Sequence, residues 1–155
     1  MHRSGTSAVT RGLEALGVDL GEKFVPDNWD NELGFWEDAD FVAFNEELQQ
    51  KLGYKWYGNT VIESINWDDE LIKAEKARAK ELLESKFAKV DIYGFKDPRT
   101  AVLIEFWRKV FCELGLTSNY LIVIRNPLDV AESLYKRNEL PKEKVLLLWA
   151  ASVFQ

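Results

Sequence analysis

The feature that most constrains the fold is a run of five apolar residues, Tyr120-Leu121-Ile122-Val123-Ile124, which leads directly into Arg125-Asn126-Pro127. Uninterrupted apolar runs rich in branched residues are typical of parallel strands buried on both faces of a sheet. A shorter strand is predicted at Asp91-Ile92-Tyr93-Gly94-Phe95. Because a helical pattern follows each strand, the order predicts a three-layer α/β fold, a parallel sheet flanked by helices. Ligands bind at the carboxyl ends of the strands in such sheets.

Six stretches carry apolar residues at helical spacing, and most of them have a recognisable start or stop signal. Gly17, Gly53 and Gly115 each follow the last apolar residue of one pattern and are expected to end it. Pro127 is expected to begin another helix, because its fixed backbone angle suits the first turn. The predicted helices cover residues 9–16, 37–52, 68–88, 103–114, 127 onward and 145–155.

The composition indicates one acidic globular domain over residues 1–155. Of the 155 residues, 46% are hydrophobic, which is enough to build a core, and the net charge is -6. A chain with this charge has no general basic field that would attract nucleic acid. The longest apolar run, residues 145–154, is too short to span a bilayer, so we expect a soluble, cytoplasmic protein with no membrane partner. Cys112 is expected to be a buried, inert thiol.

A phosphate-binding loop is predicted near the start of the chain, at Arg3-Ser4-Gly5-Thr6-Ser7. Gly5 permits a tight turn just before a helix, where the first backbone N–H groups have no partner within the helix, and Arg3 adds a full positive charge. The loop is not a Walker A motif, because no lysine follows Gly5. The alternative is a solvated N-terminus that leads into a capped helix.

A second phosphate-binding motif is predicted at the end of the apolar run. Arg125 follows the predicted strand, Pro127 begins a helix, and Ser133 falls on the second turn of that helix. This spacing lets the hydroxyl of Ser133 reach a phosphate that is held by the planar guanidinium of Arg125. The alternative is an arginine at a strand end followed by a serine that faces solvent.

The two motifs resemble those of sulfotransferases that use 3′-phosphoadenosine 5′-phosphosulfate, in which a basic residue precedes Ser-Gly-Thr-Ser and an arginine at a strand end precedes a helical serine. Two further blocks resemble stretches of bacterial members, including members that act on carbohydrates: Gly34-Phe35-Trp36-Glu37-Asp38 with Phe44-Asn45, and Lys96-Asp97-Pro98-Arg99-Thr100. The resemblance implies a fold like that of P-loop NTPases, a nucleotide-binding site for this donor and for its product adenosine 3′,5′-bisphosphate, and sulfuryl transfer to a hydroxyl or amine acceptor without a metal.

The resemblance also implies roles for single residues. The 5′-phosphosulfate would be held by Arg3, Ser4, Gly5, Thr6 and Ser7. The 3′-phosphate would be held by Arg125 and Ser133, and Arg3 would neutralise charge on the oxygen of the leaving group.

In many cytosolic sulfotransferases a mid-chain histidine takes the acceptor's proton. The single histidine here, His2, lies inside the phosphate-binding loop, so the resemblance leads us to expect a carboxylate in this role. Glu37 is the first choice, since Phe35 and Trp36 would desolvate it and raise its pKa. Asp38 is the next candidate, followed by Asp97. The alternative for Glu37 is a structural place in the first turn of a helix. Lys96, Asp97 and Arg99 would orient the loop or the acceptor, or else form an internal ion pair.

Two other functions stay open from the sequence. A nucleotide kinase or NTPase shares the predicted loop but needs a loop lysine and a carboxylate for magnesium. A non-catalytic domain would bind phosphoadenosine compounds or a protein partner. Members of the resembling family normally have a buried strand before the loop and a further segment after residue 155. We therefore expect a domain truncated at both ends, which self-associates or leans on a partner domain.

Overall fold

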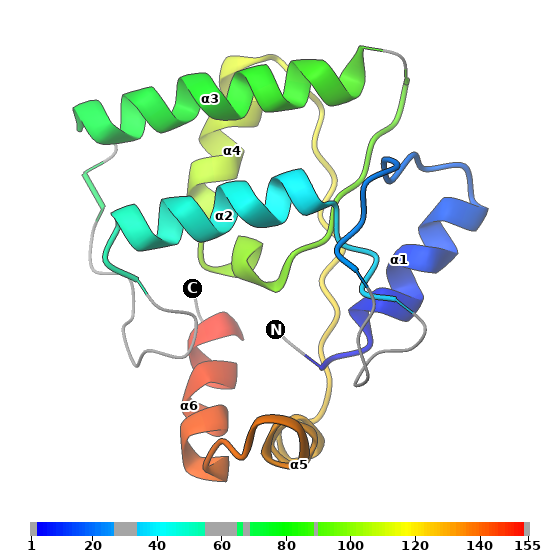
Figure 1. Ribbon diagram of the computed structural model, residues 1–155, viewed down its shortest axis with the longest axis vertical. Coiled ribbons are helices and arrows are strands. Elements are labelled where there is room, and N and C mark those ends of the chain that lie inside the picture. Colours follow the sequence, from blue (N-terminus) through cyan, green and yellow to red (C-terminus); the bar gives the residue numbers. More distant parts are fainter. Residues whose placement is uncertain (1–2, 27–33, 55–64, 67–68, 89, 154–155) are drawn as a thin grey trace.

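The structure is a computed structural model, and it describes residues 3–26, 34–54, 65–66, 69–88 and 90–153. Helices make up nearly all of the regular structure in these ranges (Figure 1). The elements are α1 Thr6–Ala15, α2 Ala39–Lys51, α3 Glu70–Phe87, the 3₁₀ helix η1 Pro98–Ala101, α4 Ile104–Glu113, α5 Pro127–Asn138 and α6 Lys142–Val153.

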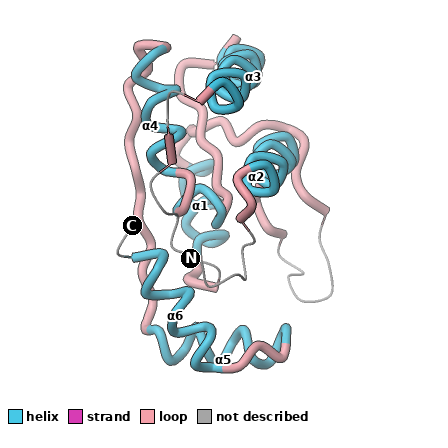
Figure 2. Tube along the Cα trace, turned by 90° about the vertical axis from the view of Figure 1, so that its left-hand side faces the viewer, coloured by secondary structure: helices cyan, strands magenta, loops and turns pink. Residues whose placement is uncertain are grey.

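The predicted three-layer α/β fold with a parallel sheet is wrong, and with it the predicted likeness to P-loop NTPases. Across the described part of the chain, β pairing is limited to two isolated bridges. One joins Asp19 to Tyr93 in parallel, and the other joins Phe24 to Asp38 in antiparallel orientation. Figure 2 accordingly shows helices connected by long loops.

The apolar run that predicted a central strand follows a long, extended path between α4 and α5, but it is not in a sheet (Figure 1). Four of its five side chains are exposed, with Leu121 at 63% and Ile122 at 79% of their full accessibility, and Val123 is partly buried. A strand exists only when a second strand pairs with its backbone. The sequence pattern indicates that a segment suits an extended conformation, but it does not indicate which segment would pair with it. That is why the prediction failed here.

The predicted helices are confirmed to within a few residues. Gly53 and Gly115 follow the ends of α2 and α4 with φ of 69° and 66°, a left-handed conformation that costs glycine little. At the other end of α2, the side chain of Asp38 accepts hydrogen bonds from the backbone N–H groups of Asp40 and Phe41. Asp69 caps the start of α3 in the same way.

The main hydrophobic core lies between α2, α3 and α4. Phe41 of α2 stacks on Phe95 with 3.9 Å between the ring centroids, and both rings contact Trp107 of α4. Full burial of a large apolar side chain contributes about 1.5–3 kcal/mol relative to exposure. The buried members are Phe41, Phe44, Leu48, Ile72, Ala79, Leu83, Leu103, Phe106, Trp107 and Val110. This core therefore fixes α2 and the segment that ends in Phe95 relative to α4.

A second, smaller core joins α5 to α6, which form a helical hairpin below the rest of the molecule in Figure 1. Its buried members are Val130, Ala131, Leu134 and Val145. Cys112 differs from its predicted position, because it lies on the outward face of α4 and is exposed. No helix of the described residues is both long enough and apolar enough to cross a membrane.

Candidate functional site

The N-terminal loop, residues 3–7, turns sharply into α1. Arg3 and Gly5 both have left-handed backbone angles, with φ of 61° and 85°, and Gly5 is the N-cap residue of α1. No side-chain hydrogen bond caps this end of α1, and its first turn contains no acidic residue. Its first backbone N–H groups are therefore open to a ligand and carry the positive end of the helix dipole. An anion is the ligand that suits such an end.

The two motifs predicted to bind phosphate meet at this loop. The Nε of Arg3 donates a hydrogen bond to the Oγ of Ser133 over 3.0 Å, although 130 positions separate the two residues. The Nη1 of Arg125 donates to the backbone carbonyl of Arg3 over 3.3 Å. Two guanidinium groups and a hydroxyl thus gather between the start of α1 and the first two turns of α5. The predicted pairing differs in detail, since Ser133 bonds to Arg3 rather than sharing a ligand with Arg125.

Ser4 supplies a further polar group in the loop. The residue is only 6% exposed, and its Oγ has no hydrogen-bond partner in the described structure. A buried hydroxyl without a partner costs about 1–3 kcal/mol. A ligand oxygen bound at the loop would remove this cost. The loop therefore offers an anion both an unsatisfied donor and positive charge.

Arg125 is held in place from the side of the hairpin. The Nε1 of Trp149 in α6 donates to the backbone carbonyl of Arg125 over 3.1 Å. The Nε of Arg125 lies 3.6 Å from the Oδ2 of Asp129, and both side chains are about half exposed. An exposed ion pair of this kind is worth little, about 0–1 kcal/mol. A phosphate can therefore compete with Asp129 for the guanidinium.

Ser7 connects the N-terminal loop to the segment before α2. Its Oγ donates to the carbonyl of Phe35 over 3.1 Å, two residues before Glu37. The hydroxyl of Ser7, predicted to contact the ligand, is thus engaged within the protein, and its backbone N–H is the group left at the helix start. Thr6 serves partly as a support, because its carbonyl accepts a hydrogen bond from Thr10 Oγ1 over 2.8 Å.

Glu37 lies in a clamped stretch of backbone. Its carbonyl accepts a hydrogen bond from Val25 N over 2.8 Å, and Ala39 N donates to the carbonyl of Lys23 over 2.8 Å. Its side chain is buried, and Oε1 accepts a hydrogen bond from Lys96 Nζ over 2.6 Å. Burial raises the pKa of Glu37 by disfavouring its charged form, and Lys96 opposes part of this rise. The arrangement yields a carboxylate more basic than usual, which suits proton abstraction.

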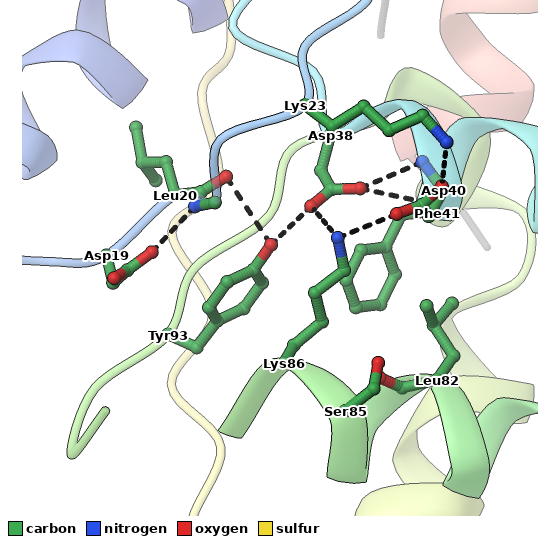
Figure 3. Close-up of polar contacts among 11 residues, drawn as sticks. Asp19, Leu20, Lys23, Asp38, Asp40, Phe41, Leu82, Ser85, Lys86 and Tyr93 are labelled. Atoms are coloured by element: carbon green, nitrogen blue, oxygen red, sulfur yellow. Dashed lines mark hydrogen bonds and ion pairs between the residues drawn. The ribbon is translucent and has the colours of Figure 1, made fainter. Parts of the chain in front are cut away.

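Asp38, the second candidate base, has structural partners on every side (Figure 3). One of its oxygens caps α2, and the other accepts hydrogen bonds from Lys86 Nζ over 2.7 Å and from the hydroxyl of Tyr93. Burial, together with the Asp38 carboxylate, raises the pKa of Tyr93, so this hydroxyl stays protonated. Sequence reasoning missed this network, since Lys86 and Tyr93 are 48 and 55 positions away from Asp38 and no local pattern links them.

Asp97, the third candidate, is part of a buried support for η1. Its carboxylate accepts hydrogen bonds from the Nδ2 of Asn45 and from the Nη1 of Arg99, both over 2.9 Å, and it caps η1 through Arg99 N. The Oδ1 of Asn45 in turn accepts from Trp107 Nε1 over 2.9 Å. The predicted internal ion pair is thus found for Asp97 and Arg99. Lys96 instead turns to Glu37.

Comparisons with protein-family models, with curated proteins and with solved structures found no match.

Proposed function

We propose that this protein is a sulfotransferase that binds 3′-phosphoadenosine 5′-phosphosulfate at the N-terminal loop and uses Glu37 as its base. The observation that carries the proposal is the contact of Arg3 with Ser133 and Arg125, which places both phosphate-type motifs beside an uncapped helix start. A single anion needs only one such motif. Two motifs in contact suit a ligand with phosphate groups at two positions.

The residues of the two motifs divide into two groups, according to the phosphate that each group would hold. The backbone at Gly5, Thr6 and Ser7 offers N–H donors, Ser4 a buried hydroxyl, and Arg3 a charge next to the same helix end. These would hold the 5′-phosphosulfate. Arg125 and Ser133 would hold the 3′-phosphate, with Arg125 leaving the weak pair with Asp129. When bound, the donor supplies an activated sulfuryl group, and adenosine 3′,5′-bisphosphate is the product left behind.

The protein's own contribution to the chemistry is a proton acceptor and a positive charge. Glu37 takes the proton from the acceptor's hydroxyl or amine, and Oε2 is the oxygen assigned to it, because Oε1 is bonded to Lys96. Arg3 neutralises the negative charge that develops at the leaving phosphate oxygen. The bond from Ser7 to Phe35 ties the loop to the segment that carries Glu37. A carbohydrate is the acceptor class that the sequence resemblance suggests.

The first test is the choice of ligand, measured as a shift in melting temperature. A ligand at about 100 times its Kd stabilises the folded state by about 2.7 kcal/mol, which raises the melting temperature by several degrees. We expect this rise with adenosine 3′,5′-bisphosphate in the presence of a chelator, and a smaller rise with ATP and magnesium.

Stabilisation by ATP and magnesium alone would instead support a kinase or NTPase. Stabilisation by adenosine 3′,5′-bisphosphate without turnover on any hydroxyl or amine acceptor would support a non-catalytic binding domain. Inorganic sulfate at the same ionic strength controls for nonspecific anion binding.

A further inference from the structure

The segment before α2 and the segment before η1 meet through an ion pair that is largely shielded from water. The side chains of Glu37 and Lys96 are 11% and 14% exposed, and 2.6 Å separates Oε1 from Nζ. Two charges in such a place cost several kcal/mol each to desolvate, so a pair of this kind is a poor way to gain stability. A pair that is costly to bury and that includes the proposed base is a candidate for a functional role.

The backbone on both sides of the pair is fixed. Glu37 is held by the bridge between residues 23–25 and 37–39. Lys96 is held between Phe95, which stacks in the main core, and Asp97, which is bonded to Asn45 and Arg99. Lys96 therefore presents its ammonium group to Glu37 from a rigid frame. The side chain of Lys23, by contrast, is 70% exposed in its pair with Asp40.

We infer that Lys96 is a positioning residue for Glu37: its ammonium group holds one carboxylate oxygen in place and leaves the other oxygen to accept the proton. This inference rests on the proposed function, because Glu37 is the base of that reaction.

Charge arguments support the same role. The charged groups that act on Glu37 are Lys96, Asp97 and Arg99, and Asp97 and Arg99 largely neutralise each other as an ion pair at 2.9 Å. Lys96 is thus the charge that offsets the effect of burial on Glu37. Without it, the pKa of Glu37 would lie higher still, and a smaller fraction of the carboxyl would be ionised and able to act as a base.

The experiment compares Lys96→Met with the wild-type protein and with Lys96→Arg, which keeps the charge. The readout that does not depend on turnover is the pH titration of Glu37, followed by carbon NMR of labelled carboxyl groups and assigned with Glu37→Gln. In Lys96→Met we expect the pKa of Glu37 to move upward by about 1 to 3 pH units, because an opposite charge nearby lowers a carboxyl pKa by that amount. Lys96→Arg should restore most of the wild-type titration.

Kinetics on a verified acceptor give the second readout. In Lys96→Met, the pH below which kcat/KM falls should rise by the same amount as the pKa of Glu37 in the NMR titration. Activity lost at pH 7 should then return at higher pH. Affinity for adenosine 3′,5′-bisphosphate should stay unchanged. Lys23→Met is the matched control, since it breaks a surface pair of equal length and should change neither readout.

The outcomes separate this inference from the proposed function. If Lys96→Met folds, as judged by circular dichroism and melting temperature, and Glu37 titrates as in the wild type, the inference is wrong even if the nucleotide binds. If Lys96→Met does not fold, Lys96→Gln replaces it in the titration, and Lys96→Arg remains the variant that keeps the charge. Failure of the nucleotide to bind the wild-type protein would overturn the proposed function while leaving the titration result intact.

Discussion

At the scale of single residues, Glu37 differs from the other two carboxylates near it. Asp38 and Asp97 both cap helices and accept hydrogen bonds from several side chains, so their oxygens are fully used. Among the described residues, the side chain of Glu37 accepts its hydrogen bond from Lys96, through Oε1. A carboxylate with one oxygen engaged and a raised pKa is the better proton acceptor of the three.

The prediction for Glu37 is a loss of turnover without a loss of donor binding. Glu37→Gln keeps the shape of the side chain but removes its basicity, so kcat should fall by about a hundredfold or more. In the wild type, activity should fall as the pH drops through the raised pKa of Glu37, because the protonated group cannot accept a second proton. Asp38→Asn is the comparison: its main loss should be in stability. Full turnover by Glu37→Gln would show that Glu37 is not the base.

At the scale of elements, the start of α2 depends on contacts with the segment that precedes it. Gly21 lies where a Cβ atom would come within 2.6 Å of the Tyr93 hydroxyl and 2.7 Å of Asp38 Oδ2, and its φ is +80°. Glycine is required there, since any side chain would push apart Tyr93 and Asp38 (Figure 3).

Gly21→Ala should therefore destabilise the protein by about 1–3 kcal/mol, the cost of forcing atoms into a filled space with a strained backbone. Urea unfolding gives the measurement. Gly12→Ala is the matched control, because a Cβ at this helical position meets nothing within 4 Å, and it should stabilise α1 by about 0.5–1 kcal/mol. Equal stability of Gly21→Ala and the wild type would show that the Asp38 network tolerates displacement.

At the scale of the whole molecule, the sequence predicted local structure well and the architecture poorly. Helix ends follow from signals within a few residues, such as Gly53 after α2 and Gly115 after α4, and these were correct. A sheet needs pairing between distant segments, and the apolar pattern of residues 120–124 carries no information on a partner. This run is exposed, and exposed apolar surface favours association. Self-association stays a prediction.

The candidate site follows the same division. The residue types in the N-terminal loop and around Arg125 could be read from spacing, because helix starts and arginines bind anions by local chemistry. Their contact could not, since Arg3 and Ser133 lie 130 positions apart. The partner of Glu37 also needed the structure. Lys96 was expected to orient the loop or the acceptor, or else to join an internal ion pair, and it pairs with a residue 59 positions away.

The central claim is that the loop and the second motif bind one nucleotide, with Arg125 serving the 3′-phosphate. Calorimetric titration with adenosine 3′,5′-bisphosphate and with adenosine 5′-monophosphate tests it most directly, on the wild type, Arg125→Ala and the surface control Arg108→Ala. Arg125→Ala should weaken binding of the bisphosphate by about 1.5–3 kcal/mol, the range for a charged hydrogen bond, and leave binding of the monophosphate unchanged. Equal affinity of the wild type and Arg125→Ala for the bisphosphate, or the same loss for both nucleotides, would contradict the claim.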